Sequence, residues 1–133
     1  MMENQRKKIL LVDDDVLYLE ITEAMLQEKY EVITAGSGKD AVLLLVKGFT
    51  PDLILLDIMM PKMDGWETFK TIRGLTLLND IPIAFLTSLT STDDISQAQD
   101  IGAVDFIMKP FERNTLIDRI EKIFAGVADK SEK

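Results

Sequence analysis

Short runs of apolar residues alternate along the chain with longer segments in which apolar residues recur every three or four positions. The short runs are bounded by turn-forming residues, which suits strands that are buried on both faces. The longer segments carry one apolar stripe each, which is typical of helices packed on a sheet. The predicted strands are residues 9–12, 31–34, 53–56, 82–86 and 104–108. This alternation predicts an α/β fold with a doubly wound, parallel, five-stranded sheet.

The apolar stripes predict which side of each helix faces the sheet. The expected inward residues are Leu17, Ile21, Ala24 and Met25 in the first helix, Ala41, Leu44 and Leu45 in the second, Trp66, Phe69 and Ile72 in the third, and Leu116, Ile117, Ile120, Ile123 and Phe124 in the last. The fourth helix, roughly residues 92–101, is only weakly amphipathic. Ser37 and Asp64 are expected to cap the second and third helices, whereas Gly102 and Gly126 are expected to end the fourth and fifth.

The connections between strands restrict the order of the sheet, because parallel crossovers are right-handed. We predict the flavodoxin-like order 2-1-3-4-5, which makes the strands of residues 9–12 and 53–56 neighbours. In open α/β sheets, ligands bind outside the carboxyl ends of the strands, where the strand order reverses. The residues that follow these two strands are therefore the first candidates for a functional site.

The composition fits one domain and limits its chemistry. The 133 residues are 47% hydrophobic, which is enough to bury a core, and neither cysteine nor histidine is present. Disulfides, thiolate metal sites and histidine bases are thereby excluded, so any catalysis must use carboxylates, hydroxyls and lysine. The net charge of -8 argues against direct binding of nucleic acid. With no signal peptide and no run near the roughly 20 apolar residues of a membrane span, we expect a cytoplasmic protein without membrane insertion.

Polar side chains that carry chemistry follow the predicted strands. Asp13 and Asp14 come after the first strand, Asp57 after the third, Thr87 after the fourth and Lys109 after the fifth. Clustered carboxylates repel one another unless a cation neutralises them, and oxygen ligands suit Mg²⁺, which commonly also binds phosphate. Asp57 can then act as a nucleophile that forms an aspartyl phosphate. Lys109 can neutralise one phosphoryl oxygen, and Thr87 can donate a hydrogen bond to another.

Five sequence blocks with this spacing resemble the receiver domain of two-component response regulators. They are Leu10–Asp14, Leu55–Pro61, Met63–Gly65, Phe85–Ser88 and Phe106–Phe111. The resemblance covers about residues 8–124, so we assign residues 1–126 to a receiver domain and residues 127–133 to a solvated C-terminal tail. It implies a signalling switch that accepts a phosphoryl group from a histidine kinase, a phosphotransfer protein or a small phosphodonor. Whether the chain is a stand-alone regulator of the chemotaxis type or a piece of a longer one stays open.

The resemblance also implies roles for individual residues of the site. Asp57 would be the phosphoacceptor, and Mg²⁺ would be held by Asp14, Asp57 and the main-chain carbonyl of Met59, with Asp13 contributing through water. Lys109 would pair with the phosphoryl group, and its peptide bond to the following proline is usually cis in this family.

The implied switch consists of Thr87 and Phe106. When the phosphoryl group draws the Thr87 hydroxyl toward itself, the aromatic ring at position 106 can turn inward; the family more often has tyrosine there. The surface formed by the fourth helix, the fifth strand and the fifth helix would then change its binding to a downstream protein. The resemblance implies either a monomer or a phosphorylation-dependent homodimer.

These motifs also allow other interpretations. Residues 36–40 contain a Gly-Lys pair but lack the first glycine and the final hydroxyl of a P-loop. A haloacid-dehalogenase-type phosphatase would need a second aspartate where the chain has Met59, and a flavodoxin-like FMN carrier would need a phosphate cradle in place of the acidic first loop. Helix capping for Asp13 to Asp15, a solvated loop position for Lys109 and a plain core position for Phe106 are the simpler structural interpretations.

Overall fold

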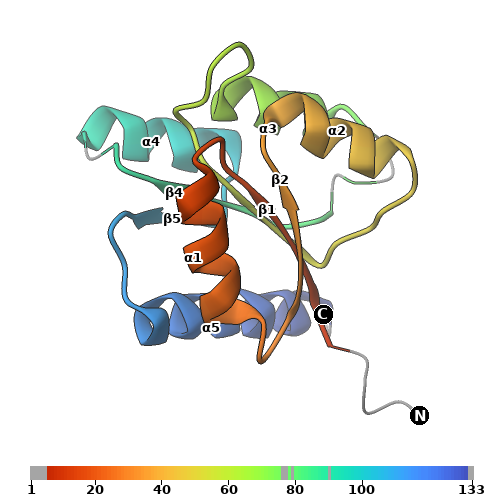
Figure 1. Cartoon of the computed structure of the whole chain (residues 1–133), viewed down its shortest axis with the longest axis vertical. Helices are drawn as coiled ribbons and strands as arrows, with labels where there is room; N and C mark the ends of the chain where they lie inside the picture. Colours follow the sequence, from red (N-terminus) through yellow and green to blue (C-terminus); the bar gives the residue numbers. More distant parts are fainter. Residues whose placement is uncertain (1–5, 76–77, 79, 90, 132–133) are drawn as a thin grey trace.

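The computed structural model describes residues 6–75, 78, 80–89 and 91–131. Its parallel sheet has the predicted order β2-β1-β3-β4-β5 (Figure 1). The strands are β1 (Lys8–Val12), β2 (Glu31–Ala35), β3 (Leu53–Leu56), β4 (Ile83–Thr87) and β5 (Asp105–Met108). The helices are α1 (Val16–Leu26), α2 (Gly38–Val46), α3 (Gly65–Arg73), α4 (Thr92–Ile101) and α5 (Arg113–Ser131). The flavodoxin-like fold predicted from the sequence is confirmed.

The apolar strands separate two layers of core. Residues that alternate along each strand point to opposite faces, so Leu10 and Leu56 pack with α2, α3 and α4, whereas Leu11 and Leu55 pack with α1 and α5. The side chains of the central strands β1 and β3 are buried except for that of Lys8. Both faces of the central strands are therefore covered by helices, whereas the edge strands β2 and β5 keep exposed or half-buried residues.

The inward face of α1 differs from the prediction. Leu17 is 63% exposed and Ile21 is 41% exposed, whereas Leu19, Thr22 and Leu26 are buried against the sheet. The helix carries apolar residues on more than one side, and the true inward stripe includes a threonine, which weakens its hydrophobic signal. Its predicted inward residue Ala24 is exposed as well, and of the predicted set Met25 alone packs against the core. The inward residues predicted for α2, α3 and α5 do pack in the core.

The ends of the helices follow the predicted capping with one exception. Ser37 accepts a hydrogen bond from the amide of Asp40, and Asp64 accepts one from the amide of Glu67. Gly102 follows α4 in the left-handed conformation with φ of 98°. The prediction that Gly126 ends the last helix is wrong, because α5 continues to Ser131. One glycine costs a helix only about 1 kcal/mol, which the flanking helix-forming residues can offset.

None of the helices in the described part of the chain combines the length and the apolar character that crossing a bilayer would require.

Candidate functional site

Backbone hydrogen bonds hold the polar residues at the carboxyl edge of the sheet. The Asp57 amide donates to the carbonyl of Val12 at 2.9 Å, and the Asp13 amide donates to the carbonyl of Ala35 at 3.1 Å. On the other side of the site, the Lys109 amide donates to the carbonyl of Thr87 at 2.9 Å. Each bond extends the strand pairing one residue beyond the apolar run. The side chains that follow the strands are thus placed by the rigid sheet.

The predicted convergence of three aspartates is confirmed. Asp13, Asp14 and Asp57 each have a carboxylate oxygen within 4.8 Å of the other two. Asp13 and Asp57 are buried, at 5% and 6% exposure, whereas Asp14 is exposed. Carboxylates this close repel one another, and burial strengthens the repulsion. A positive charge nearby therefore stabilises the cluster.

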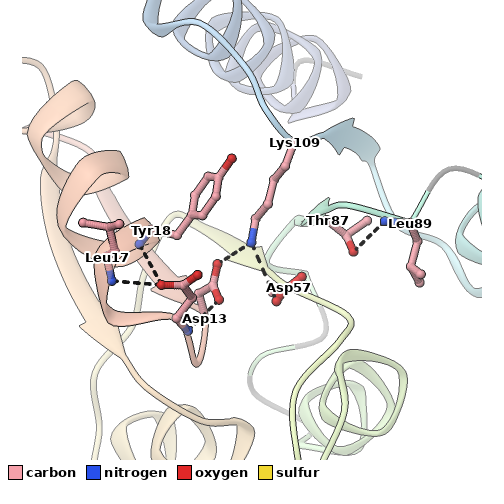
Figure 2. A network of polar contacts seen from close by, with 8 residues as sticks. Asp13, Leu17, Tyr18, Asp57, Thr87, Leu89 and Lys109 are labelled. Atoms are coloured by element: carbon pink, nitrogen blue, oxygen red, sulfur yellow. Dashed lines mark hydrogen bonds and ion pairs between the residues drawn. The ribbon is translucent and has the colours of Figure 1, made fainter.

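Lys109 supplies a positive charge between two of these carboxylates (Figure 2). Its ammonium Nζ lies 2.6 Å from Oδ2 of Asp13 and 3.8 Å from Oδ2 of Asp57. The lysine side chain is only 10% exposed, which excludes the solvated loop interpretation. Its peptide bond to Pro110 is cis, as the resemblance implies.

Burial raises the pKa of the Asp57 carboxyl from its ordinary value of 3.8 to about 6. The positive charge of Lys109 opposes this rise in pKa, and the negative charge of Asp13 adds to it. Keeping Asp57 ionised therefore lowers the free energy of unfolding. An additional cation beside the carboxylate would reduce this loss of stability. A strongly shifted carboxyl in a polar hollow is a recognised mark of a functional site.

The site opens to solvent through a pocket of about 410 Å³. It is lined by Asp13, Asp14, Asp15, Tyr18, Asp57, Met59, Ser88, Lys109 and Pro110. The Met59 side chain is 58% exposed and forms part of the rim. The nucleophile predicted from the sequence therefore lies in an accessible pocket, although its own side chain is nearly covered.

The two residues of the implied switch lie on adjacent strands. Thr87 is fully buried at the end of β4, and its hydroxyl oxygen accepts a hydrogen bond from the Leu89 amide at 3.3 Å. Phe106 on β5 is half-buried and its ring lies 6.3 Å from that of Phe85. Figure 2 shows the Thr87 hydroxyl directed toward Leu89. Thr87 is the last residue of β4, one residue further along the strand than predicted.

Two residues beside the site, Asp15 and Tyr18, make contacts that the sequence did not fully predict. Asp15 is the cap of α1, because its carboxylate accepts hydrogen bonds from the amides of Leu17 and Tyr18. Capping, one of the interpretations considered for the three consecutive aspartates, thus applies to Asp15. Tyr18 was not predicted, yet its ring centre lies 4.2 Å from Nζ of Lys109. No motif indicated it, because the contact joins residues far apart in the sequence.

A family model described as "Response regulator receiver domain" matches residues 9–121 of the chain. The chain belongs to this family. The receiver domain is a phosphoacceptor signalling module rather than a conventional enzyme, and its acidic pocket of Asp13, Asp14 and Asp57 with Lys109 is in keeping with that role. The assignment favours this reading over the phosphatase and the FMN carrier. A histidine kinase is the kind of partner that a receiver domain implies.

Curated relatives and solved structures agree with this assignment. The chain is 42% identical over 130 residues to the probable transcriptional regulator ycf27 of Pyropia yezoensis, covering 97% of this chain and 51% of that protein. It is 37% identical over 120 residues to the DNA-binding response regulator MtrA of Mycobacterium bovis, covering 90% and 51% respectively. The chain thus spans about half the length of these relatives.

Among solved structures, the chemotaxis protein CheY4 of Vibrio cholerae matches with a TM-score of 0.83 and 32% identity, covering 88% of this chain and 98% of that chain. A CheY-like receiver domain protein from Methanospirillum hungatei matches with a TM-score of 0.85 and 27% identity, covering 95% and 99%. Both similarities extend over nearly all of the described fold.

Proposed function

We propose that Asp57 is the residue that accepts the phosphoryl group, in a reaction that depends on Mg²⁺. The observation that supports this most directly is the position of Asp57, buried at the end of β3 with Lys109 and two further carboxylates around it. A carboxylate in this setting can attack phosphorus, and the surrounding charges can stabilise the transferred group.

The donor set fits a magnesium ion. Three carboxylates lie close enough to share one ion, and all-oxygen ligation is what Mg²⁺ prefers. We assign Asp14, Asp57 and the main-chain carbonyl of Met59 as ligands, with Asp13 contributing through water. When bound, the ion would offset the negative charge of the acidic pocket and of the incoming phosphoryl group.

The transfer itself requires few groups from the protein. A carboxylate oxygen of Asp57 forms a bond to phosphorus while the bond from phosphorus to the donor's nitrogen or oxygen breaks, and the electron pair leaves with the donor. Lys109 holds one phosphoryl oxygen as a point charge, and the Thr87 hydroxyl donates a hydrogen bond to another. No residue needs to remove a proton from the nucleophile, because the reacting form of Asp57 is already ionised.

The test of this proposal is incubation of the protein with a small phosphodonor and Mg²⁺, followed by intact-mass measurement. We expect the wild type to gain the mass of one phosphoryl group and Asp57→Asn to gain none, because an amide is a poor nucleophile. Chelation of Mg²⁺ should slow the gain in the wild type. A phosphoryl group that still appears on Asp57→Asn would remove Asp57 from this role.

The phosphoryl group is proposed to act through Thr87 and Phe106. Drawing the Thr87 hydroxyl toward the phosphoryl oxygen would take it from the Leu89 amide and free space behind it, into which the half-buried Phe106 ring can turn. The surface of α4, β5 and α5 then differs between the two forms. Phosphorylation shifts the population only because it makes contacts in one form that it lacks in the other.

Replacing Thr87 with alanine is expected to separate phosphorylation from this response. The variant should still gain phosphate on Asp57, more slowly, because the nucleophile and Lys109 remain. Most of the change in the amide resonances of β5 and α4 that the wild type shows on phosphorylation should be lost, as measured by NMR. Resonance changes at Phe106 that match those of the wild type would show that Thr87 does not transmit the signal.

The proposed partners of this domain follow from the proposed phosphorylation of Asp57 and the change that it causes at the surface of α4, β5 and α5. The phosphodonor would be a histidine kinase, a phosphotransfer protein or a small molecule, and a downstream protein would bind the face of α4, β5 and α5. Met108 on β5 is 48% exposed and Val104, immediately before β5, is 42% exposed, so both provide apolar surface that such a partner could bury. The same surface could pair two copies of the domain after phosphorylation.

A further inference from the structure

The ring of Tyr18 covers the ammonium group of Lys109. Nζ of Lys109 lies 4.2 Å from the ring centre, inside the range of about 6 Å in which a cation is attracted to the face of an aromatic ring. Figure 2 shows the ring beside the lysine side chain, on the α1 side of the pocket. We propose that Tyr18 is a positioning residue that keeps Lys109 directed at the phosphoryl group; this inference rests on the proposed function of Lys109.

Lys109 needs such a partner because its ion-pair partners are carboxylates that are also proposed to hold the metal. Its ammonium is now held by Asp13 at 2.6 Å and is 3.8 Å from Asp57. A divalent ion bound to these carboxylates would neutralise part of their negative charge. The electrostatic attraction between the carboxylates and the lysine would then be weaker. The face of an aromatic ring is not a ligand for Mg²⁺, so the contact with Tyr18 persists when the metal binds.

A lysine side chain is otherwise poorly fixed. It has a flexible four-carbon stem and a strongly hydrated charge, and holding it in one geometry costs rotamer entropy. Phosphoryl transfer depends on placing the positive charge accurately, so a ring that restricts the ammonium to the pocket increases the rate.

The ring of Tyr18 is itself held in place. The Tyr18 amide donates to Oδ1 of Asp15 at 3.3 Å, which fixes the residue in the first turn of α1. Its ring packs edge-on against Phe111, with ring centres 6.1 Å apart and the planes at 60°. Phe111 follows Lys109 by two residues, so the tyrosine contacts both the lysine and the segment that carries it. The arrangement joins α1 to the connection between β5 and α5.

The decisive comparison is between Tyr18→Phe, which keeps the ring, and Tyr18→Leu, which removes it. At saturating phosphodonor and Mg²⁺, we expect Tyr18→Phe to be phosphorylated within about twofold of the wild-type rate. Tyr18→Leu should be slower by about 3- to 30-fold, the range that a partly desolvated cation–π contact represents. The variant Tyr30→Leu makes the same chemical change at a buried ring that packs on Phe124, remote from the pocket, and should leave the rate unchanged.

A second measurement separates positioning of the lysine from a general effect on folding. In a Lys109→Met background, adding Tyr18→Leu should produce no further loss of rate, because the ring acts through the ammonium. The Lys109 side-chain protons should show the upfield NMR shift of a neighbouring ring in the wild type and in Tyr18→Phe, but not in Tyr18→Leu.

The inference is overturned if Tyr18→Leu is phosphorylated as fast as the wild type, or if its loss is undiminished when Lys109 is absent. These outcomes are distinct from failure of the proposed function, in which the wild type itself gains no phosphoryl group or Asp57→Asn still gains one.

Discussion

Replacing Gly65 with alanine is expected to lower the free energy of unfolding by about 2–3 kcal/mol, because the added methyl group has no room. A Cβ at this position would lie 2.4 Å from the carbonyl oxygen of Asp57 and 2.6 Å from Cα of Ile58. Both are backbone atoms of the segment that carries Asp57, the proposed nucleophile, so neither can move aside by changing a rotamer. The Gly65 amide also donates to the carbonyl of Ile58 at 2.8 Å, which holds the start of α3 against this segment.

The same substitution should slow phosphorylation more than its effect on stability would suggest. Relief of the clash displaces Asp57, and a shift of about 1 Å at a reacting group can reduce a rate on the order of 100-fold. Chemical denaturation and the rate of phosphorylation at a temperature where the variant is folded measure the two effects separately.

Gly36→Ala is the matched control, because a Cβ at Gly36 would meet no atom within 4 Å. We expect its stability to change by less than about 0.5 kcal/mol and its rate of phosphorylation to stay the same. If the two variants lost similar amounts of stability and of phosphorylation rate, the close approach of Gly65 to the backbone of Asp57 and Ile58 would not explain why glycine is needed at position 65.

The sheet could be predicted because its signal is local and repeated. Each strand is a run of aliphatic residues that ends at a polar residue, and the right-handed crossover rule leaves few orders for such strands. The convergence of Asp13, Asp14 and Asp57 then follows from the strand order alone. Each acid directly follows a buried apolar run, so a one-residue shift of a strand toward its amino end would carry an aspartate into the sheet, where an unpaired charge is costly.

The parts that were predicted wrongly depend on packing rather than on periodicity. In α1, Leu17 and Ile21 fit a helical stripe as well as Leu19 and Leu26 do, and only the approach of α5 and the sheet decides which stripe is buried. In α5, a glycine resembles a stop signal, but the helix continues through it to Ser131. Hydrophobic pattern alone cannot settle either case.

The contact between Tyr18 and Lys109 could not be predicted from the sequence. The ring meets Lys109 only because α1 and the end of β5 are brought to the same edge of the sheet. A tyrosine in the first turn of an amphipathic helix has no sequence feature that distinguishes it from a core aromatic. Residues that act through another side chain are therefore identified from the folded structure, whereas the acids and the lysine were identified from their places at strand ends.

Replacing Asp57 with asparagine is expected to stabilise the protein at pH 7 in the absence of divalent cations, by about 1–3 kcal/mol. Burial raises the pKa of this carboxyl from 3.8 to about 6, so at neutral pH the folded protein holds a charge that would be more stable in the unfolded chain. Asparagine removes that charge. Lys109 keeps Asp13 as its partner at 2.6 Å, so the substitution does not leave the lysine unpaired.

The sign of the pH dependence follows from the two pKa values. Because the pKa is higher in the folded protein than in the unfolded chain, the folded protein binds more protons between about pH 4 and pH 6. The free energy of unfolding of the wild type should therefore fall as the pH rises through this window, relative to that of Asp57→Asn. The difference between the two proteins should be near zero below about pH 4 and reach its full value above about pH 6, as measured by chemical denaturation across this range.

Two controls make the interpretation specific. Asp100→Asn removes the same charge from an exposed position on α4 and should change stability by less than about 0.5 kcal/mol at any pH in this range. Adding Mg²⁺ should stabilise the wild type more than Asp57→Asn, because an ion that binds only the folded state shifts the equilibrium toward it and the variant lacks one ligand. A variant that is less stable than the wild type at pH 7, or a difference that does not change between pH 4 and pH 7, would show that the charge on Asp57 does not oppose folding. In the expected case, the domain loses stability by keeping a nearly buried carboxylate ionised, and that is the form in which Asp57 is proposed to react.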